Sequence, residues 1–183
     1  MGISTLIMCL CAVFSFLGQP RDEAVKLIIQ EKRVAVNGRT SIGGFTCRYS
    51  DRNVRDTLFV DFSTRTPDLV FDIVVDDFGC GNFMLNRDFK KTLKSKEFPK
   101  ARVRVGNIRT SNSKYFCDLT VNMVGKKLDF PNLELVRNTE GVTAQIGMGF
   151  STLGLEPPSK MGGLVTVDEA LKLEIFLGFR VSR

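Results

Sequence analysis

A single helical segment stands in a chain whose other segments alternate apolar and polar residues with the period of a strand. Between residues 70 and 105 the order is a strand, a tight turn with a cysteine, a helix and another strand. Leu85, Phe89 and Leu93 are spaced by four, which is typical of the apolar stripe of an amphipathic helix. One helix among many strands has to pack on the sheet or across its end, so we predict a helix over about 83–96 that caps the fold.

Both ends of the predicted helix carry sequence signals. Asn82 or Asn86 can cap its start, and Pro99 stops it, because the residue before a proline disfavours the helical conformation. The face opposite the apolar stripe is basic. Such a face is most often only solvated, and its alternative role is contact with an anionic membrane surface. The cations that would make this contact are Arg87, Lys90, Lys91 and Lys94.

The other segments predict an all-β fold of about eight antiparallel strands. We expect Asn37-Gly38 to end an early strand, Pro131 to interrupt a later one, and residues 69–76 to form a single strand. Antiparallel strands with one apolar face close most easily into a barrel, because a barrel leaves no exposed edge. A sandwich is the alternative.

The last segment has two interpretations. Residues 166–169 read as a helical capping box, whereas every odd position from Leu171 to Val181 is apolar. Six alternations outweigh one cap motif, so we predict a long closing strand rather than a helix.

The composition argues against catalysis. The chain has no histidine, which removes the commonest general base and metal ligand. Asp76 and Asp77 are adjacent, so as strand residues they would face opposite sides of the sheet. The cysteines lack CxxC spacing, and the segment 79–81 lacks the Lys-Ser/Thr of a phosphate-binding loop. We therefore expect no enzyme, no metal and no cofactor.

The start of the chain indicates its compartment. Residues 1–18 carry no charge and are mostly apolar, but they are too short for an ordinary membrane span, so we predict a signal peptide followed by one domain over 24–183. An uncleaved anchor is the alternative. We expect a periplasmic or secreted protein. The net charge of +6 comes without any nucleic-acid-binding motif, so we expect no nucleic-acid partner.

Three cysteines follow the predicted signal peptide. Cys47 and Cys80 each lie beside a strand–turn feature, and a disulfide between them would tie an early strand to the entry of the helix. The alternative is two buried thiols. Cys117 lies in the apolar register of its strand, so we expect it to be an inert buried thiol.

The apolar positions of successive strands define one inner face. Core packing is the default use of such a face. An eight-stranded barrel can also hold one slim ligand, and Met and Phe side chains line such a tunnel adaptably. The residues predicted to line the lumen and to bind an apolar ligand are Phe45, Val60, Phe62, Phe71, Ile73, Phe89, Leu93, Leu119, Val121, Met123, Ile146, Met148, Phe150, Leu173, Ile175, Leu177 and Phe179.

Several motifs resemble those of YceI-like proteins. They are RDFKKTLKSKEFP at 87–99, KARVRV at 100–105, DLTV with Gly125-Lys126 at 118–126, and FSTLGL at 150–155. The FTC and CGN motifs at 45–47 and 80–82 resemble a branch found in secreted proteins of the Bacteroidetes type. Three features depart from the family pattern: Asp118 stands where the hairpin motif has glycine, Pro131 interrupts a strand, and the strand ends near Lys26 to Val36 are unusually charged.

The resemblance, which spans residues 25–181, implies a lipocalin-like, extended barrel with a helix at one end. It also implies a ligand, a polyisoprenoid or quinone lipid held in the lumen. Three other classes stay open: a structural or protein-interaction barrel without lipid, an outer-membrane barrel and an enzyme. The missing histidine disfavours the enzyme, and the chain end at Val181-Ser182-Arg183, without a terminal aromatic residue, disfavours the outer-membrane barrel.

Overall fold

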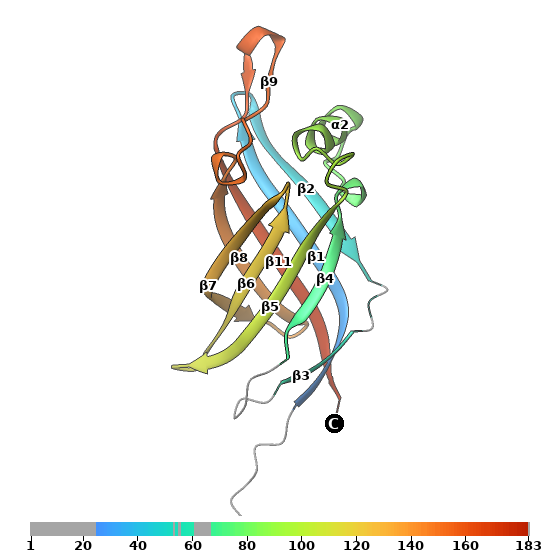
Figure 1. Cartoon of the computed structure of the whole chain (residues 1–183), viewed down its shortest axis with the longest axis vertical. Helices are drawn as coiled ribbons and strands as arrows, with labels where there is room; N and C mark the ends of the chain where they lie inside the picture. Colours follow the sequence, from blue (N-terminus) through green and yellow to red (C-terminus); the bar gives the residue numbers. More distant parts are fainter. Residues whose placement is uncertain (1–24, 53, 55, 61–66, 183) are drawn as a thin grey trace, which may run out of the picture.

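The structure is a computed structural model that describes residues 25–182 except 53, 55 and 61–66. An antiparallel sheet of strand order β2-β1-β11-β8-β7-β6-β5-β4 curls into an incompletely closed barrel, with the short β3 also paired to β1. Figure 1 shows an elongated molecule with the helix α2 at the upper end and the C-terminus at the lower end. The prediction of a lipocalin-like, all-β barrel with one helix is confirmed. The predicted signal peptide lies outside the described residues.

The long strands alternate buried and exposed side chains, as expected for one inner and one outer face. They are β1 (Val25–Thr40), β2 (Gly43–Asp51), β3 (Thr57–Val60), β4 (Leu69–Val74), β5 (Lys100–Ser111), β6 (Lys114–Met123), β7 (Lys126–Arg137), β8 (Gly141–Gly149) and β11 (Ala170–Ser182). A two-stranded hairpin, β9 (Ser159–Lys160) and β10 (Val165–Thr166), stands at the helix end of the barrel (Figure 1). The helix is α2 (Phe83–Thr92).

Two narrow seams divide the barrel into one half with β2-β1-β11-β8 and β3 beside β1, and another half with β7-β6-β5-β4. At the first seam β7 and β8 pair only at Val136 with Thr143 and Arg137 with Val142. At the second, β2 and the segment after β4 are joined by a pair of backbone hydrogen bonds between Arg48 and Gly79, of 2.8 and 2.9 Å. The structure also contains the predicted disulfide between Cys47 and Cys80, which lies beside this bridge and fastens the second seam covalently.

The first hairpin differs from the prediction. Asn37-Gly38 does not end β1, which continues to Thr40 and turns after it. Gly38 pairs with Phe45 across the hairpin, and a Cβ at Gly38 would overlap the Phe45 ring. The glycine is needed to make room for an aromatic ring within the strand, rather than to form a turn.

The helix starts as predicted and ends early. The side chain of Asn82 accepts a hydrogen bond from Leu85 N at 2.9 Å, which makes Asn82 the cap, whereas Asn86 accepts one from Cys80 N at 2.6 Å. The helix stops at Thr92 instead of residue 96, because Lys94 adopts a positive φ of 50° that ends the helical path before Pro99.

The segment before the helix also corrects a prediction. The strand β4 ends at Val74, and Val75–Asp77 forms a 3-10 turn. Asp76 and Asp77 therefore do not face opposite sides of a strand.

The closing strand β11 is confirmed, and the residues that resemble a capping box have another use. Glu169 precedes β11, and its carboxylate accepts hydrogen bonds from Ser151 N at 2.8 Å and Ser151 Oγ at 2.5 Å. These bonds lower the pKa of the Glu169 carboxyl. Glu169 thus holds the 3-10 turn Ser151–Leu153 instead of starting a helix.

Candidate functional site

An apolar space, which we call cavity 1, lies in the half of the barrel away from the helix and has a volume of about 350 Å³. Its walls are aliphatic and aromatic side chains from β1, β3, β4, β5, β6, β7, β8 and β11. Among the described residues of this wall, Tyr115, Arg137 and the Cys117 thiol bring polar groups to it. Arg137 and Val181 are exposed, and both lie at the end of the barrel where β1 starts and β11 ends, so the described part of the chain leaves the cavity open there.

A second space, cavity 2, lies beneath the helix and has a volume of about 130 Å³. The stripe Leu85, Phe89 and Leu93 faces it from α2. Above it Lys160 Nζ of the β9–β10 hairpin lies 2.9 Å from Asp88 Oδ1 of the helix, whose side chain is only 17 % exposed. The helix caps this end of the barrel, as predicted, and an ion pair ties it to the hairpin.

The two cavities share no lining residue. Between them lies a layer that we call the septum, in which each member comes from a different strand and none is more than 8 % exposed. Phe71, Val103 and Val121 are direct neighbours across β4, β5 and β6. The lumen is therefore hollow at both ends and packed in the middle. The septum consists of Val34, Phe71, Val103, Val121 and Ile146.

The residues predicted to line the lumen fall into three groups. Those that line cavity 1 are Leu119, Ile175, Leu177 and Phe179. Those that line cavity 2 are Phe45, Phe89, Leu93, Met123, Met148, Phe150 and Leu173. Four line neither cavity and are packed core: Phe71, Ile73, Val121 and Ile146. Phe62 and the side chain of Val60 lie outside the described residues. That any of these side chains binds a ligand stays a prediction.

Much of the wall of cavity 1 was missed by the sequence reasoning. The missed residues include Leu27 and Ile29 of β1, Leu133 and Leu135 of β7, and Ala144 of β8. Leu27, Ile29 and Ala144 lie in the inward register of segments that alternate clearly in the sequence, whereas Leu133 and Leu135 follow the bulge that shifts the inward register of β7. The alternation could have identified the first three, because residues two positions apart on a strand point to the same side of the sheet.

Comparisons with known proteins identify the fold. No protein-family model matches the chain, and no curated protein matches it. A polyisoprenoid-binding domain from Saccharophagus degradans, described as implicated in plant cell wall breakdown, superposes with a TM-score of 0.55 at 11% identity, covering 85% of this chain and 98% of that one. The YceI protein of Campylobacter jejuni superposes with a TM-score of 0.51 at 12% identity, covering 69% of this chain and 79% of that one. The chain has the YceI fold.

Within this YceI fold a bulge on β1 brings an unexpected charge inside. The pairing of β1 with β11 slips between Ile29 and Glu31, so Lys32 takes an inward position and is only 7 % exposed. Its Nζ lies 4.5 Å from the centroid of the Phe71 ring and 2.8 Å from Asp56 Oδ2. The ion pair and the aromatic face together satisfy the buried ammonium beside the septum.

Bulges on β5 and β7 shape the wall of cavity 1, and they account for two of the departures from the family pattern, Asp118 and Pro131. One bulge lies between Gly106 and Arg109 and contains Asn107, with φ of 50°. The other lies opposite Cys117 and Leu119 and contains Asn132, with φ of 55°. Pro131 therefore does not interrupt β7, because a bulge does not require its missing N–H.

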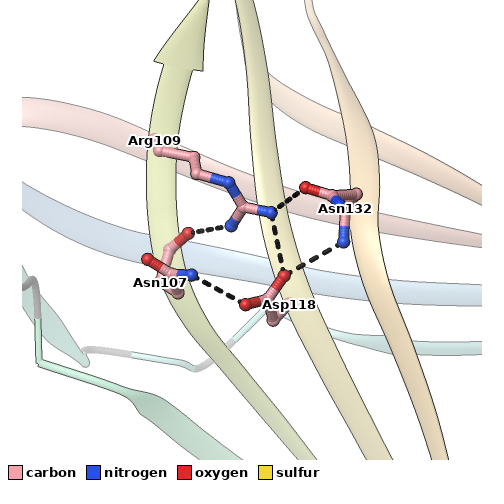
Figure 2. A network of polar contacts seen from close by, with 4 residues as sticks. All are labelled: Asn107, Arg109, Asp118 and Asn132. Atoms are coloured by element: carbon pink, nitrogen blue, oxygen red, sulfur yellow. Dashed lines mark hydrogen bonds and ion pairs between the residues drawn. The ribbon is translucent and has the colours of Figure 1, made fainter.

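A polar network on the outer face holds both bulges (Figure 2). Asp118 accepts hydrogen bonds from Asn132 N at 3.0 Å, from the Asn107 amide at 2.8 Å and from Arg109 at 3.0 Å. Arg109 also donates to the Asn132 side chain and to Asn107 O. The Asn132 N–H, followed by the Asn107 amide, lowers the pKa of the Asp118 carboxyl. The network thus supports the positions of Ile108 and Leu133, which line cavity 1 on either side.

The cysteines divide as the sequence predicts. Cys47 and Cys80 form a disulfide across a sequence separation of 33 residues. Cys117 is free, is 1 % exposed and lines cavity 1. Burial, with the nearby Asp118 carboxylate, raises the pKa of the Cys117 thiol to about 11. At neutral pH the cavity wall therefore carries a neutral thiol.

The basic residues of α2 gather on its outer side. Arg87, Lys90, Lys91 and Lys94 line a shallow open groove together with Lys96, Asp76 and Glu97. Lys90 is paired with Asp76 at 3.7 Å. Phe83 and Met84, at the start of the helix, are 79 % and 61 % exposed. The surface beside cavity 2 therefore combines cations with exposed apolar side chains.

Two further features concern the described part of the chain. No helix there is both long and apolar enough to cross a membrane. The same residues contain no group of three or more His, Cys, Asp or Glu side chains that could hold a metal ion.

Proposed function

We propose that the chain is a non-enzymatic binding protein of the YceI-like family that holds an apolar lipid chain inside its barrel. The observation that carries the proposal is cavity 1, a space of about 350 Å³ with an almost wholly apolar wall. Water forms few hydrogen bonds in an apolar cavity, so its release costs little free energy. A hydrocarbon chain that enters the cavity gains van der Waals contacts with the wall.

An isoprenoid, such as a polyprenyl or quinone tail, is the finer form of this proposal. Its support is the YceI fold, which the chain shares with a polyisoprenoid-binding domain, together with the sequence motifs. Transport or storage of the lipid would take place in the cell envelope, in the periplasm or outside the cell. The Cys47–Cys80 disulfide fits such a compartment, because disulfides persist where conditions are oxidising.

The test is organic extraction of the purified full-length protein, followed by mass spectrometry of the extract. We expect one lipid per chain. The matched variants are Ala144→Phe, which fills cavity 1 from a position 5 % exposed, and Gln145→Phe, which places the same ring on the exposed outer face. We expect the first variant to lose the lipid and the second to keep it, with both folded by circular dichroism. Lipid-free protein that also fails to take up added lipid would contradict the proposal.

The alternative is a structural or protein-interaction barrel without lipid. Pull-down of a specific partner from envelope extracts, with no lipid in either fraction, would favour it. The two cavities favour the lipid-binding function, because a barrel that serves only as a scaffold needs no empty interior.

A second part of the proposal concerns the basic groove on α2. Arg87, Lys90, Lys91 and Lys94 would dock the helix end on an anionic membrane, with Phe83 and Met84 at the level of the head groups. Each cation near such a surface contributes about 1 kcal/mol. Sedimentation with vesicles should show binding to phosphatidylglycerol and not to phosphatidylcholine. The variant in which Arg87, Lys90, Lys91 and Lys94 are all replaced by Gln should no longer bind phosphatidylglycerol vesicles. Equal binding of that variant would contradict membrane docking.

A further inference from the structure

The septum ends cavity 1 inside the barrel. Phe71, Val103 and Val121 are adjacent across three strands, and Val34 and Ile146 complete the layer from β1 and β8. Lys32, held by Asp56, lies against the Phe71 ring and precedes Val34 on β1, on the side toward Ile29. A chain that enters at the open end meets a packed wall before it reaches cavity 2.

The volume of cavity 1 sets a chain length. A cavity of about 150 Å³ holds one benzene molecule, so each carbon needs about 25 Å³. At that packing 350 Å³ corresponds to about 14 carbons, whereas an eight-unit polyprenyl chain of about 40 carbons needs roughly 1,000 Å³. Cavity 2 is smaller, because its 130 Å³ corresponds to only about five carbons at the same packing.

The length of cavity 1 gives a similar answer by an independent route. On β11 its wall runs from Ile175 to Val181, which is roughly 20 Å of strand. Barrel strands tilt by about 35–45°, so the depth along the barrel axis is roughly 15 Å. An extended chain advances by roughly 1.3 Å per carbon, given C–C bonds of about 1.5 Å and angles near 111°. The cavity therefore accommodates roughly 12 extended carbons.

One cation marks the open end. Among the described residues that line cavity 1, Arg137 is the only one with a charge. It is exposed at the end of β7, and its Nη1 donates a long hydrogen bond of 3.4 Å to Tyr115 Oη, which also lines the cavity. A guanidinium beside a phenol favours carboxylate or phosphate oxygens over an uncharged group.

We propose that cavity 1 selects a single-chain anionic lipid with about 14–15 carbons, its tail ending at the septum and its head group at Arg137. This inference rests on the proposed function and narrows its ligand. A straight-chain fatty acid of about 14 carbons and a three-unit prenyl diphosphate of about 15 carbons share the required chemistry. Within the isoprenoids of the proposed function, the septum restricts the enclosed chain to about three units, so longer polyprenyl and quinone tails would not fit inside cavity 1.

The test is isothermal titration of the delipidated full-length protein with two series of probes. One series is saturated fatty acids of about 10 to 20 carbons, and the other is prenyl diphosphates of about two to eight units. We expect affinity to rise about fourfold per carbon up to about 14–15 carbons and then to stop rising. The series whose best probe binds with the lower dissociation constant shows whether the preferred chain is a straight acyl chain or a prenyl chain.

Two variant pairs locate the limit and the head group. Phe71→Ala opens the septum and should extend the optimum by about five carbons, the capacity of cavity 2, whereas Val70→Ala on the outer face should leave it unchanged. Val121→Ala serves the same purpose should Phe71→Ala not fold. Arg137→Gln should weaken anionic probes about fivefold and leave the matching alcohols unaffected.

The outcomes separate this inference from the proposed function. Affinity that keeps rising to the longest probe overturns the chain-length limit alone, because the lumen would still bind lipid. Equal binding of acids and alcohols overturns the role of Arg137. Failure of every probe to bind, together with lipid-free protein as purified, overturns both proposals.

Discussion

Removal of the Cys47–Cys80 disulfide should destabilise the barrel by an amount that its position determines. The disulfide closes a loop across 33 residues, and it lies beside the single Arg48–Gly79 bridge that joins β2 to the segment after β4. Loop-closure entropy for about 33 residues corresponds to about 3.7 kcal/mol at 25 °C. For a domain of this size such a loss lowers the melting temperature by about 7–15 °C.

The variant to measure is Cys47→Ala/Cys80→Ala, by urea unfolding followed by circular dichroism. We expect a loss of about 3–4 kcal/mol and a larger m-value, because the denatured chain expands when the cross-link is removed. Wild-type protein in reductant should lose a similar amount, and the double variant should not respond to reductant. Cys117→Ala keeps the disulfide and should keep the response to reductant. A loss below about 1 kcal/mol in the double variant would refute the reasoning.

Three further predictions concern the core and the polar network. Phe71→Ala should cost about 3–5 kcal/mol in urea unfolding, whereas Val70→Ala, on the outer face of the same strand, should cost less than about 1 kcal/mol; equal losses would contradict the assigned faces. The Cys117 thiol, with its pKa raised to about 11 by burial, should react with a thiol reagent only after unfolding, and rapid labelling of the native protein would contradict its burial. The pKa of the Asp118 carboxyl is lowered in the folded state, first by the Asn132 N–H. Asp118 therefore stabilises the fold fully above about pH 4, the pKa range of an unfolded aspartate, and this stabilisation is lost as the pH falls through the folded-state pKa. Asp118→Asn should therefore flatten the acid side of the stability profile, and an unchanged slope would argue against the network.

The sequence was sufficient for the elements that follow a simple period. Six apolar odd positions correctly predicted β11 in spite of a competing cap motif, and the four-residue spacing of Leu85, Phe89 and Leu93 correctly predicted a helix that caps the barrel. The Cys47–Cys80 pairing was also predicted correctly. Periodicity succeeds for β11 and α2 because the spacing of apolar residues alone determines which face of the element each side chain occupies.

Predictions failed where one residue shifted the register. The bulge between Ile29 and Glu31 turns Lys32 inward, and the bulges at Asn107 and Asn132 displace the inward positions of β5 and β7. A bulge adds one residue to one strand, and it leaves no periodic trace in a short segment. Pro131 and Gly38 were read as breaks because their use within a strand depends on a partner across the sheet.

The division of the lumen could not be derived from the sequence either. Phe71, Ile73, Val121 and Ile146 occupy the same kind of inward apolar position as Leu119 and Leu177, yet the first four are packed and the last two line a cavity. The difference depends on how side chains from separate strands fill space, which alternation does not encode. The Bacteroidetes-type branch and the predicted signal peptide stay predictions.

The most direct test is a crystal structure of the protein with a fatty acid of about 14 carbons that carries bromine on its terminal carbon. The bromine is located by its anomalous scattering. The account predicts one peak inside the barrel beside Leu119 and Ile175, on the cavity 1 side of the septum, with the carboxylate at Arg137. A bromine on the outer surface, or bound lipid with both cavities still empty, would contradict it.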